Sequence, residues 1–222
     1  MKRFFSGILL CVAGCAANYA LRGFSRFLGT GLFLDTVFTI SVTLSGGIWA
    51  GFFTAIISTI CFEFPWNNSW AYFLFGICSL ASACLTWIFI RLFPRECGSF
   101  NLWDDGAASV QGEEPTLLDR FVMLLLFCLA MCALISVLGG LIAVFIETVI
   151  HVPITLSPET YFKLGLLRQG LNLVTAEILA RLPINIVDRL ISVFVAYGAA
   201  LLLKRGAGKF LPPKKIFKYR HS

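Results

Sequence analysis

The stretch that decides the fold is FVMLLLFCLAMCALISVLGGLIAVFIETVIHV, residues 121–152. Glu147 is the one formally charged side chain in these 32 residues. About 20 apolar residues in an α-helix cross a hydrocarbon core of about 30 Å. The stretch is therefore long enough to cross a bilayer with a tilt, or to project beyond the lipid.

The composition of the whole chain agrees with this interpretation. Of the 222 residues, 58% are hydrophobic, 14% are charged and 22 are Phe, and the mean hydropathy is +0.85. Soluble domains carry about 25% charged residues. A water-soluble chain of this length could not bury so much apolar surface. The polar stretch 94–120 has 27 residues, too few for a second folded domain. The sequence excludes a soluble enzyme and a disordered chain, and it predicts a membrane protein.

Further apolar runs flank the central one on both sides. Ser45-Gly46-Gly47 separates two short runs, Pro94 ends another, and Pro153 follows the central run. None of the runs shows the ten-residue alternation of a membrane β-barrel. We therefore expect an all-α, polytopic membrane protein, a single transmembrane domain over residues 1–222. Its expected bundle has six membrane-spanning helices, at about 4–21, 31–44, 48–62, 70–93, 121–152 and 184–203.

The segment between the last two spans is less apolar. Residues 155–183 read as a loop followed by an amphipathic helix over 161–182, because their apolar residues recur at helical spacing. These apolar residues are Leu171, Leu173, Val174, Ile178 and Leu179. We expect an amphipathic segment that connects the last two spans.

The distribution of Lys and Arg predicts the orientation. With six spans both termini share one side, which then carries twelve cations against five on the other. The side richer in cations is cytoplasmic in most membrane proteins. We therefore expect an N-in, C-in protein with a cytoplasmic loop at 94–120 and the segment 155–183 outside. Seven cations lie in the tail 204–222. Such a flank indicates contact with anionic membrane lipid rather than with nucleic acid.

The N-terminus admits a second interpretation. Lys2-Arg3 followed by an apolar run resembles a signal peptide, and Val12-Ala13-Gly14-Cys15 matches a bacterial lipobox. Cleavage there would leave five spans. A lipoprotein normally continues as a soluble domain, whereas this chain continues as apolar helices, so we favour a retained first span.

No sequence pattern predicts a catalytic, metal or cofactor site. The eight Cys form no CxxC and no Cys/His set with zinc spacing. HExxH, GxSxG and phosphate-loop motifs are missing from the sequence. Glu177 and Arg181 have the i,i+4 spacing of a helical ion pair. We expect a protein that is not an enzyme and holds no cofactor and no metal.

Polar residues within or beside the spans gather on the outer side in the predicted topology. Charges inside a span cost about 2.5–3.5 kcal/mol each, so they mark candidate functional sites. We expect an outward-open pocket that binds a small molecule. Its candidate residues are Asp35, Asn67, Asn68, Trp70, Glu147, Asn185, Asp188 and Arg189.

A purely structural role for these residues stays open. Asp188 and Arg189 could pair with Asp35 or Glu147 and lock the bundle. Asp35 could also be an acid at a helix N-terminus, and Asn185 or Asp188 could cap a helix that begins after Pro183. These alternatives predict ion pairs and caps in place of a ligand site.

The first span has a face of small residues. Ala13 with Ala17, and Ala16 with Ala20, form two small-xxx-small pairs. Such pairs let another helix approach closely. The approaching helix is either a neighbour in the same chain or a partner protein.

Three segments carry a resemblance to a known family. They are LFLDTVFTI at 32–40, GGIWAG at 46–51 and RLPINIVDR at 181–189. Together with six short helices and an alanine-rich first span, they resemble the S component of energy-coupling factor (ECF) transporters. S components are the substrate-binding membrane subunits of vitamin and metal importers of bacteria and archaea.

The resemblance implies a division of labour and a location in the bacterial inner membrane. An S component captures its substrate on the outer face. It hands the substrate to a coupling transmembrane subunit and ABC ATPases. The AxxxA alanines of the first span contact the coupling subunit, and Ala13, Ala16, Ala17 and Ala20 match that motif.

The substrate and two other classes of protein remain open. Acids and an arginine are compatible with a cationic, zwitterionic or amide-bearing small molecule. Trp66, Trp70 and Tyr72 could stack on a flat ring or form an interfacial aromatic belt. A membrane sensor module and a scaffold protein without a ligand are the alternative functions, although a sensor normally carries its output domain in the same chain.

Overall fold

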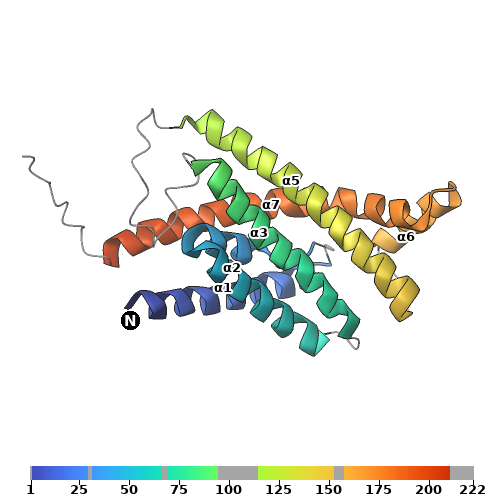
Figure 1. The fold of residues 1–222 in the computed structure, drawn as a ribbon, viewed down its shortest axis with the longest axis horizontal. Helices are drawn as coiled ribbons and strands as arrows, with labels where there is room; N and C mark the ends of the chain where they lie inside the picture. The colour runs from blue at the N-terminus through green and yellow to red at the C-terminus, as the bar shows by residue number, and fades with distance from the viewer. Residues whose placement is uncertain (1, 30–31, 67–69, 95–114, 153–157, 211–222) are drawn as a thin grey trace, which may run out of the picture.

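The fold is that of a computed structural model, which describes residues 2–29, 32–66, 70–94, 115–152 and 158–210. The described part of the chain is helical and contains no strand. Its elements, shown in Figure 1, are α1 (Lys2–Phe27), α2 (Val37–Trp66), the 3₁₀ helix η1 (Trp70–Phe75), α3 (Gly76–Leu92), α5 (Leu117–Phe145), the π-helix η3 (Ile146–Ile150), α6 (Pro158–Arg168) and α7 (Leu173–Phe210).

The prediction of an all-α membrane bundle is confirmed. Within the described residues, five helices are long and apolar enough to cross a bilayer. Many large apolar side chains on them are exposed, among them Leu9, Trp49 and Phe53. Such a surface suits lipid rather than water. The five stretches are Gly7–Phe27, Val37–Phe62, Trp70–Leu92, Leu117–Ile150 and Leu173–Lys204.

The centre of the bundle is formed by α2, α3, α5 and α7. The α5 helix packs along α7, and α2 packs against both α3 and α7. Phe89 of α3 and Phe127 of α5 meet with ring centroids 4.7 Å apart. Ala196 and Ala200 of α7 are fully buried. Small residues at such contacts let helices approach closely, which is how helices associate in lipid.

The α2 helix is broken at Gly47, which has φ 82° and ψ 178°. Asn18 on α1 shows that the two parts fold back on each other. Its Nδ2 donates to both Thr39 Oγ1 (3.1 Å) and Ser58 Oγ (3.3 Å). These two residues would be about 28 Å apart on a straight helix with 1.5 Å per residue. The parts 37–46 and 48–66 therefore form a hairpin, called here the α2 hairpin.

The α2 hairpin brings its two arms into direct contact. A Cβ on Gly51 would lie 2.0 Å from Thr43 Oγ1 and 3.0 Å from Thr43 Cβ. Position 51 therefore needs a residue without a side chain. The expected interruption at Ser45-Gly46-Gly47 is present in the structure.

The segment before α2 differs from the expected helix over 31–44. Residues 32–35 are not helical, Leu34 is left-handed with φ 43°, and α2 begins at Val37. Side chains of other helices take up the free amide groups here. Asn18 Oδ1 accepts from Phe38 N (2.8 Å), and Asp188 on α7 accepts from the segment before it. Non-helical backbone at membrane depth is tolerated where protein groups satisfy it in this way.

The region before the last span also differs from expectation. The predicted helix over 161–182 is divided by a turn at Gln169 and Gly170. Asn172 Oδ1 then caps α7 by accepting from Thr175 N (2.8 Å), and α7 continues through Pro183 instead of starting after it. A proline inside a helix removes one backbone hydrogen bond. Tertiary contacts on both sides of this position, such as Asn185 Nδ2 to Ser136 Oγ at 2.8 Å, accompany the continuous helix.

Other helix ends extend beyond the apolar runs. The α1 helix continues past residue 21 through Arg22 and Arg26. The α5 helix starts at Leu117, because Thr116 and Asp119 form a capping box before it. Residues 95–114 of the predicted cytoplasmic loop and 211–222 of the basic tail lie outside the described residues.

The helix ends divide between two sides of the bundle. The start of α1 and the end of α7 lie on the same side in Figure 1. The end of α5 and the α6 helix lie on the opposite side, and α1 runs toward that side, where its residues Arg22 and Arg26 line the same pocket as α6. We call this opposite side the cavity end, because this pocket opens there.

Candidate functional site

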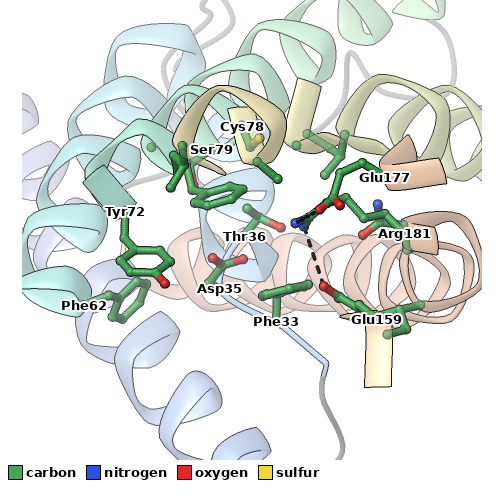
Figure 2. A pocket seen from close by; sticks show the side chains of 18 of the residues that line it. Phe33, Asp35, Thr36, Phe62, Tyr72, Cys78, Ser79, Glu159, Glu177 and Arg181 are labelled. Carbon is green, nitrogen blue, oxygen red and sulfur yellow. Dashed lines mark hydrogen bonds and ion pairs between the residues drawn. The ribbon is translucent and has the colours of Figure 1, made fainter. Parts of the chain in front are cut away.

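The cavity end contains a pocket of about 470 Å³. Ligand pockets usually measure about 300–1,000 Å³. Residues of α1, α2, η1, α3, α5, η3, α6 and α7 line it, together with the extended segment before α2. Elements from the whole chain thus converge on a single space, part of which is shown in Figure 2.

One part of the wall is aromatic. Phe33, Phe62, Tyr72 and Phe75 line the pocket. The rings of Tyr72 and Phe75 are stacked, with centroids 6.4 Å apart. In Figure 2 the rings of Phe62 and Tyr72 lie on one side of the pocket, and Glu159, Glu177 and Arg181 lie on the other.

The opposite part of the wall is an ion-pair network that joins α6, α7 and η3. Lys163 Nζ lies 2.9 Å from Glu147 Oε2 and 3.1 Å from Glu177 Oε2. Arg181 lies 3.1 Å from Glu177 Oε1 and 3.8 Å from Glu159 Oε2, the contact dashed in Figure 2. The ion pair predicted between Glu177 and Arg181 is confirmed. The network holds α6 over the pocket.

The surroundings change the pKa values of two side chains of α6, Lys163 and Glu159. Burial alone would lower the pKa of Lys163. The hydrogen bonds and negative charges of Glu147 and Glu177 outweigh it, so the pKa of Lys163 is raised. Burial raises the pKa of Glu159, and the charge of Glu177 adds to this effect, although Arg181 opposes it. Ionised Lys163 is therefore stabilised in the fold, whereas ionised Glu159 is destabilised.

We expect Glu159→Gln to raise the melting temperature at pH 7. Because the pKa of Glu159 is raised in the folded protein, its ionised form carries a penalty that builds up as the pH rises from the ordinary pKa of Glu to the raised pKa and is complete above it. The wild-type carboxyl loses that penalty on protonation, so the difference between the proteins should shrink toward about pH 4, near the ordinary pKa of Glu. Thermal unfolding of detergent-purified protein across this range measures it.

Glu177→Gln is the matched control, since Glu177 contacts both Lys163 and Arg181 at 3.1 Å. This variant should melt lower than the wild type at pH 7, because it leaves the buried Lys163 and the partly buried Arg181 with fewer partners. A lower melting temperature for Glu159→Gln at pH 7 would contradict the expected penalty.

Asp35 lies on the aromatic side of the pocket. Its Oδ2 is 3.4 Å from Arg22 NH1, across from α1. The guanidinium of Arg22 also sits over the ring of Phe62, 5.0 Å from its centroid. Arg22 therefore occupies the corner formed by an aromatic ring and a carboxylate, which is the arrangement that attracts cations.

Asp188 and Arg189 are adjacent and both buried, with exposed fractions of 0% and 2%. Asp188 Oδ1 accepts from the backbone N of Phe33 (3.1 Å) and of Leu34 (2.9 Å). Its other carboxylate oxygen pairs with Arg189, which in turn donates to Thr36 Oγ1. Asp188 is absent from the pocket lining, whereas Arg189 contributes to it. Asp188 thus holds the backbone that carries Asp35 and Thr36.

The structure brings together half of the predicted site residues at the pocket surface: Asp35, Glu147, Asn185 and Arg189. Trp70 is 68% exposed and does not line the pocket. Asn67 and Asn68 lie outside the described residues. The structural alternative expected Asp188 and Arg189 to pair with Asp35 or Glu147, whereas in the structure they pair with each other.

Other pocket residues were not predicted as site residues from the sequence. Glu159 and Lys163 on α6, and Arg22 and Arg26 on α1, all line the pocket. Each of these pairs has i,i+4 spacing, which places both members on one face of a helix. This i,i+4 spacing is the feature of the sequence that indicates that the two members of each pair share a helix face.

The small-residue face of α1 points away from the rest of the described chain. Ala13, Ala16 and Ala20 are exposed, and Ala17 is partly exposed. The opposite face, with the buried residues Cys11, Gly14, Cys15 and Asn18, packs against α2. A neighbour in the described part of the chain therefore does not use the alanine face.

Comparisons of this chain with family models, with curated proteins and with solved structures found no match.

Proposed function

We propose that this protein is the substrate-binding membrane subunit of an ECF-type ABC importer. It would capture a small molecule in the pocket at the cavity end and hand it to a coupling membrane subunit with its ATPases. The observation that carries the proposal is the pocket of about 470 Å³ with buried charges in its wall. Charged residues are costly at membrane depth, and their convergence around a cavity favours a binding role.

We also propose six membrane passes, with both termini in the cytoplasm. The α2 hairpin supports this number, since its two arms would count as two passes. The first arm, 37–46, covers about 15 Å at 1.5 Å per residue. The extended residues before it, which Asp188 holds, lengthen this pass. The common side of the start of α1 and the end of α7 agrees with an even number of passes. The pocket would then open outward.

The exposed alanine face of α1 supports a helix–helix contact with a partner. Ala13, Ala16 and Ala20 are exposed along one side of a helix that packs on α2 by its other side. A face without bulky side chains allows two backbones to approach closely in lipid. In the proposed importer the partner is the coupling subunit.

Purification of the tagged protein from its native membrane in a mild detergent, followed by mass spectrometry, tests the proposal. We expect a coupling membrane protein and ABC ATPases to co-purify with it. Ala13→Leu and Ala16→Leu should reduce their recovery at least tenfold, because added side chains block close helix approach. Both variants should keep the wild-type melting temperature, since these positions are exposed.

Ala133→Leu is the matched control, because Ala133 is an exposed alanine on α5. It should recover the partners at the wild-type level. Recovery of a kinase or of a biogenesis complex without ATPases would contradict the importer and favour the sensor or the scaffold. Equal loss of partners in all three variants would contradict the role of the α1 face.

A further inference from the structure

We infer that the pocket selects a flat, apolar ring that carries a carboxylate. The inference rests on the proposed binding function and adds the chemical class of the ligand. It differs from the cationic, zwitterionic or amide-bearing ligand that the sequence suggested. Three features of the wall lead to it: its surplus of hydrogen-bond donors, its occupied carboxylates and its aromatic side.

Charges in the wall are nearly balanced. Five cationic and four acidic side chains line the pocket, and Asp188 adds a carboxylate behind Arg189. The cationic residues are Arg22, Arg26, Lys163, Arg181 and Arg189, and the acidic ones are Asp35, Glu147, Glu159 and Glu177. The wall therefore does not require a ligand with a large net charge of either sign.

Hydrogen-bond capacity in the wall is not balanced. A guanidinium offers five N–H donors and no acceptor, whereas a carboxylate offers about four acceptor sites. Among the buried atoms of the lining residues, Arg181 Nε and Arg189 Nε have no hydrogen-bond partner. The buried acceptors Glu177 Oε2 and, behind Arg189, Asp188 Oδ2 are each in contact with a cation, Glu177 with Lys163 at 3.1 Å and Asp188 with Arg189. The guanidinium groups carry more N–H donors than each paired carboxylate can accept, and a ligand carboxylate that reaches the partly exposed side chain of Arg181 would accept charge-assisted bonds from it.

The acidic side chains of the wall already form ion pairs with cationic side chains of the protein itself. Asp35 pairs with Arg22, Glu147 with Lys163, and Glu177 with both Lys163 and Arg181. A cationic ligand would have to displace one of these side chains. At the aromatic corner it would have to expel Arg22 from the ring of Phe62 as well. The same pairs hold Arg22 and Arg181 in place, which prepares their guanidinium groups for an anion.

The aromatic side of the wall accounts for the ring. Phe33, Phe62, Tyr72 and Phe75 line it, and Arg181 lies over the ring of Phe75 at 5.5 Å. Figure 2 places the rings of Phe33, Phe62 and Tyr72 around the same space as Arg181. A ligand with its ring among the phenyl groups has Arg181 within reach of its polar end. Offset stacking of rings is favourable beyond the burial of apolar area.

Calorimetric titration of the detergent-purified full chain tests the inference with four probes. Indole-3-acetate, indole-3-acetamide and tryptamine share one ring and differ in charge, and acetate lacks the ring. We expect indole-3-acetate to bind at least tenfold more tightly than each of the others. Equal or tighter binding of the amide or of the amine, or no binding of indole-3-acetate, would overturn the inference.

A pair of variants connects this selectivity to the wall. Arg181→Gln combined with Glu177→Gln removes one cation and one acid together, which keeps the charge balance. We expect this double variant to bind indole-3-acetate at least tenfold more weakly. Arg91→Gln is the matched control, because Arg91 also lies over a ring, that of Trp87 at 5.2 Å, but does not line the pocket. Unchanged affinity of a folded double variant would overturn the inference.

Cys78 gives a second measurement that does not depend on those variants. This thiol lines the pocket and is partly exposed. We compare its labelling by an anionic sulfonatoethyl and by a cationic trimethylammonioethyl methanethiosulfonate, each rate divided by that with 2-mercaptoethanol, with Cys78→Ser as the blank. The anionic reagent should react at least fivefold faster. A faster reaction of the cationic reagent would overturn the inference.

Failure of this inference and failure of the proposed importer give different results. Co-purification of a coupling subunit and ATPases, together with tighter binding of tryptamine, would leave the importer standing and remove the carboxylate. Tight binding of indole-3-acetate without such partners would keep the ligand class and remove the importer.

Discussion

Asp188→Ala should remove most of the folded protein from a detergent-solubilised preparation. The substitution leaves the guanidinium of Arg189 buried without its carboxylate partner. Breaking a buried ion pair in this way costs about 3–5 kcal/mol. It also leaves the N–H groups of Phe33 and Leu34 without their acceptor, at about 1–3 kcal/mol for an unsatisfied buried group. Together these losses approach the whole stability of many proteins, about 5–15 kcal/mol.

Thermal unfolding and monodisperse yield measure this effect. Asp188→Asn is the graded control, because its amide oxygen can still accept from the two N–H groups while the charge is lost. Its melting temperature should lie between those of the wild type and of Asp188→Ala. If Asp188→Ala instead keeps the wild-type melting temperature and loses only ligand binding, Asp188 is a ligand contact, as the sequence suggested, and the structural role is wrong.

Gly51→Ala should destabilise the protein by about 1–3 kcal/mol, the usual cost of overpacking. Helix propensity alone predicts the opposite sign, since Ala is favoured over Gly in a helix by about 1 kcal/mol. The added Cβ would lie 2.0 Å from Thr43 Oγ1 and 3.3 Å from Ala83 Cβ. The arms of the α2 hairpin would then have to separate. Thermal unfolding of the purified variant measures the change.

Gly23→Ala on α1 is the matched control, because a Cβ there meets nothing within 4 Å. This variant should be as stable as the wild type or more stable. Adding Thr43→Ala to Gly51→Ala removes the hydroxyl nearest to the new methyl group and should recover part of the loss. Equal melting temperatures for Gly51→Ala and Gly23→Ala would mean that the two arms of α2 are not in contact.

The polar residues show how far the sequence predicts the site. Asp35, Glu147, Asn185 and Arg189 were grouped by their expected depth in the membrane, and all four line the pocket. Depth can be read from sequence because residues in a membrane helix advance by a constant 1.5 Å. The same argument groups Trp70 with them, yet Trp70 is exposed and does not line the pocket. Depth alone does not say on which side of a helix a residue lies relative to its neighbours.

The ion-pair partners show which contacts the sequence predicts and which it does not. Glu177 and Arg181 are one helical turn apart, so their contact followed from spacing. Lys163 contacts Glu147 and Glu177 across three elements, and Asp188 contacts the backbone 155 and 154 positions away. No local periodicity encodes such contacts, because they depend on which helices become neighbours.

The sequence by itself determined that this is an all-α membrane bundle and that the helix is interrupted within Ser45-Gly46-Gly47, and it grouped four of the polar residues that line the pocket. These properties follow from length, apolar content and backbone freedom, which are local. The tertiary structure alone decided that the arms of α2 fold together, that α6 closes the wall of the pocket, and that Asp188 supports the backbone instead of lining the pocket. Each of these depends on close packing between helices far apart in sequence, because in lipid the fit of side chains selects among arrangements that apolar content leaves equal.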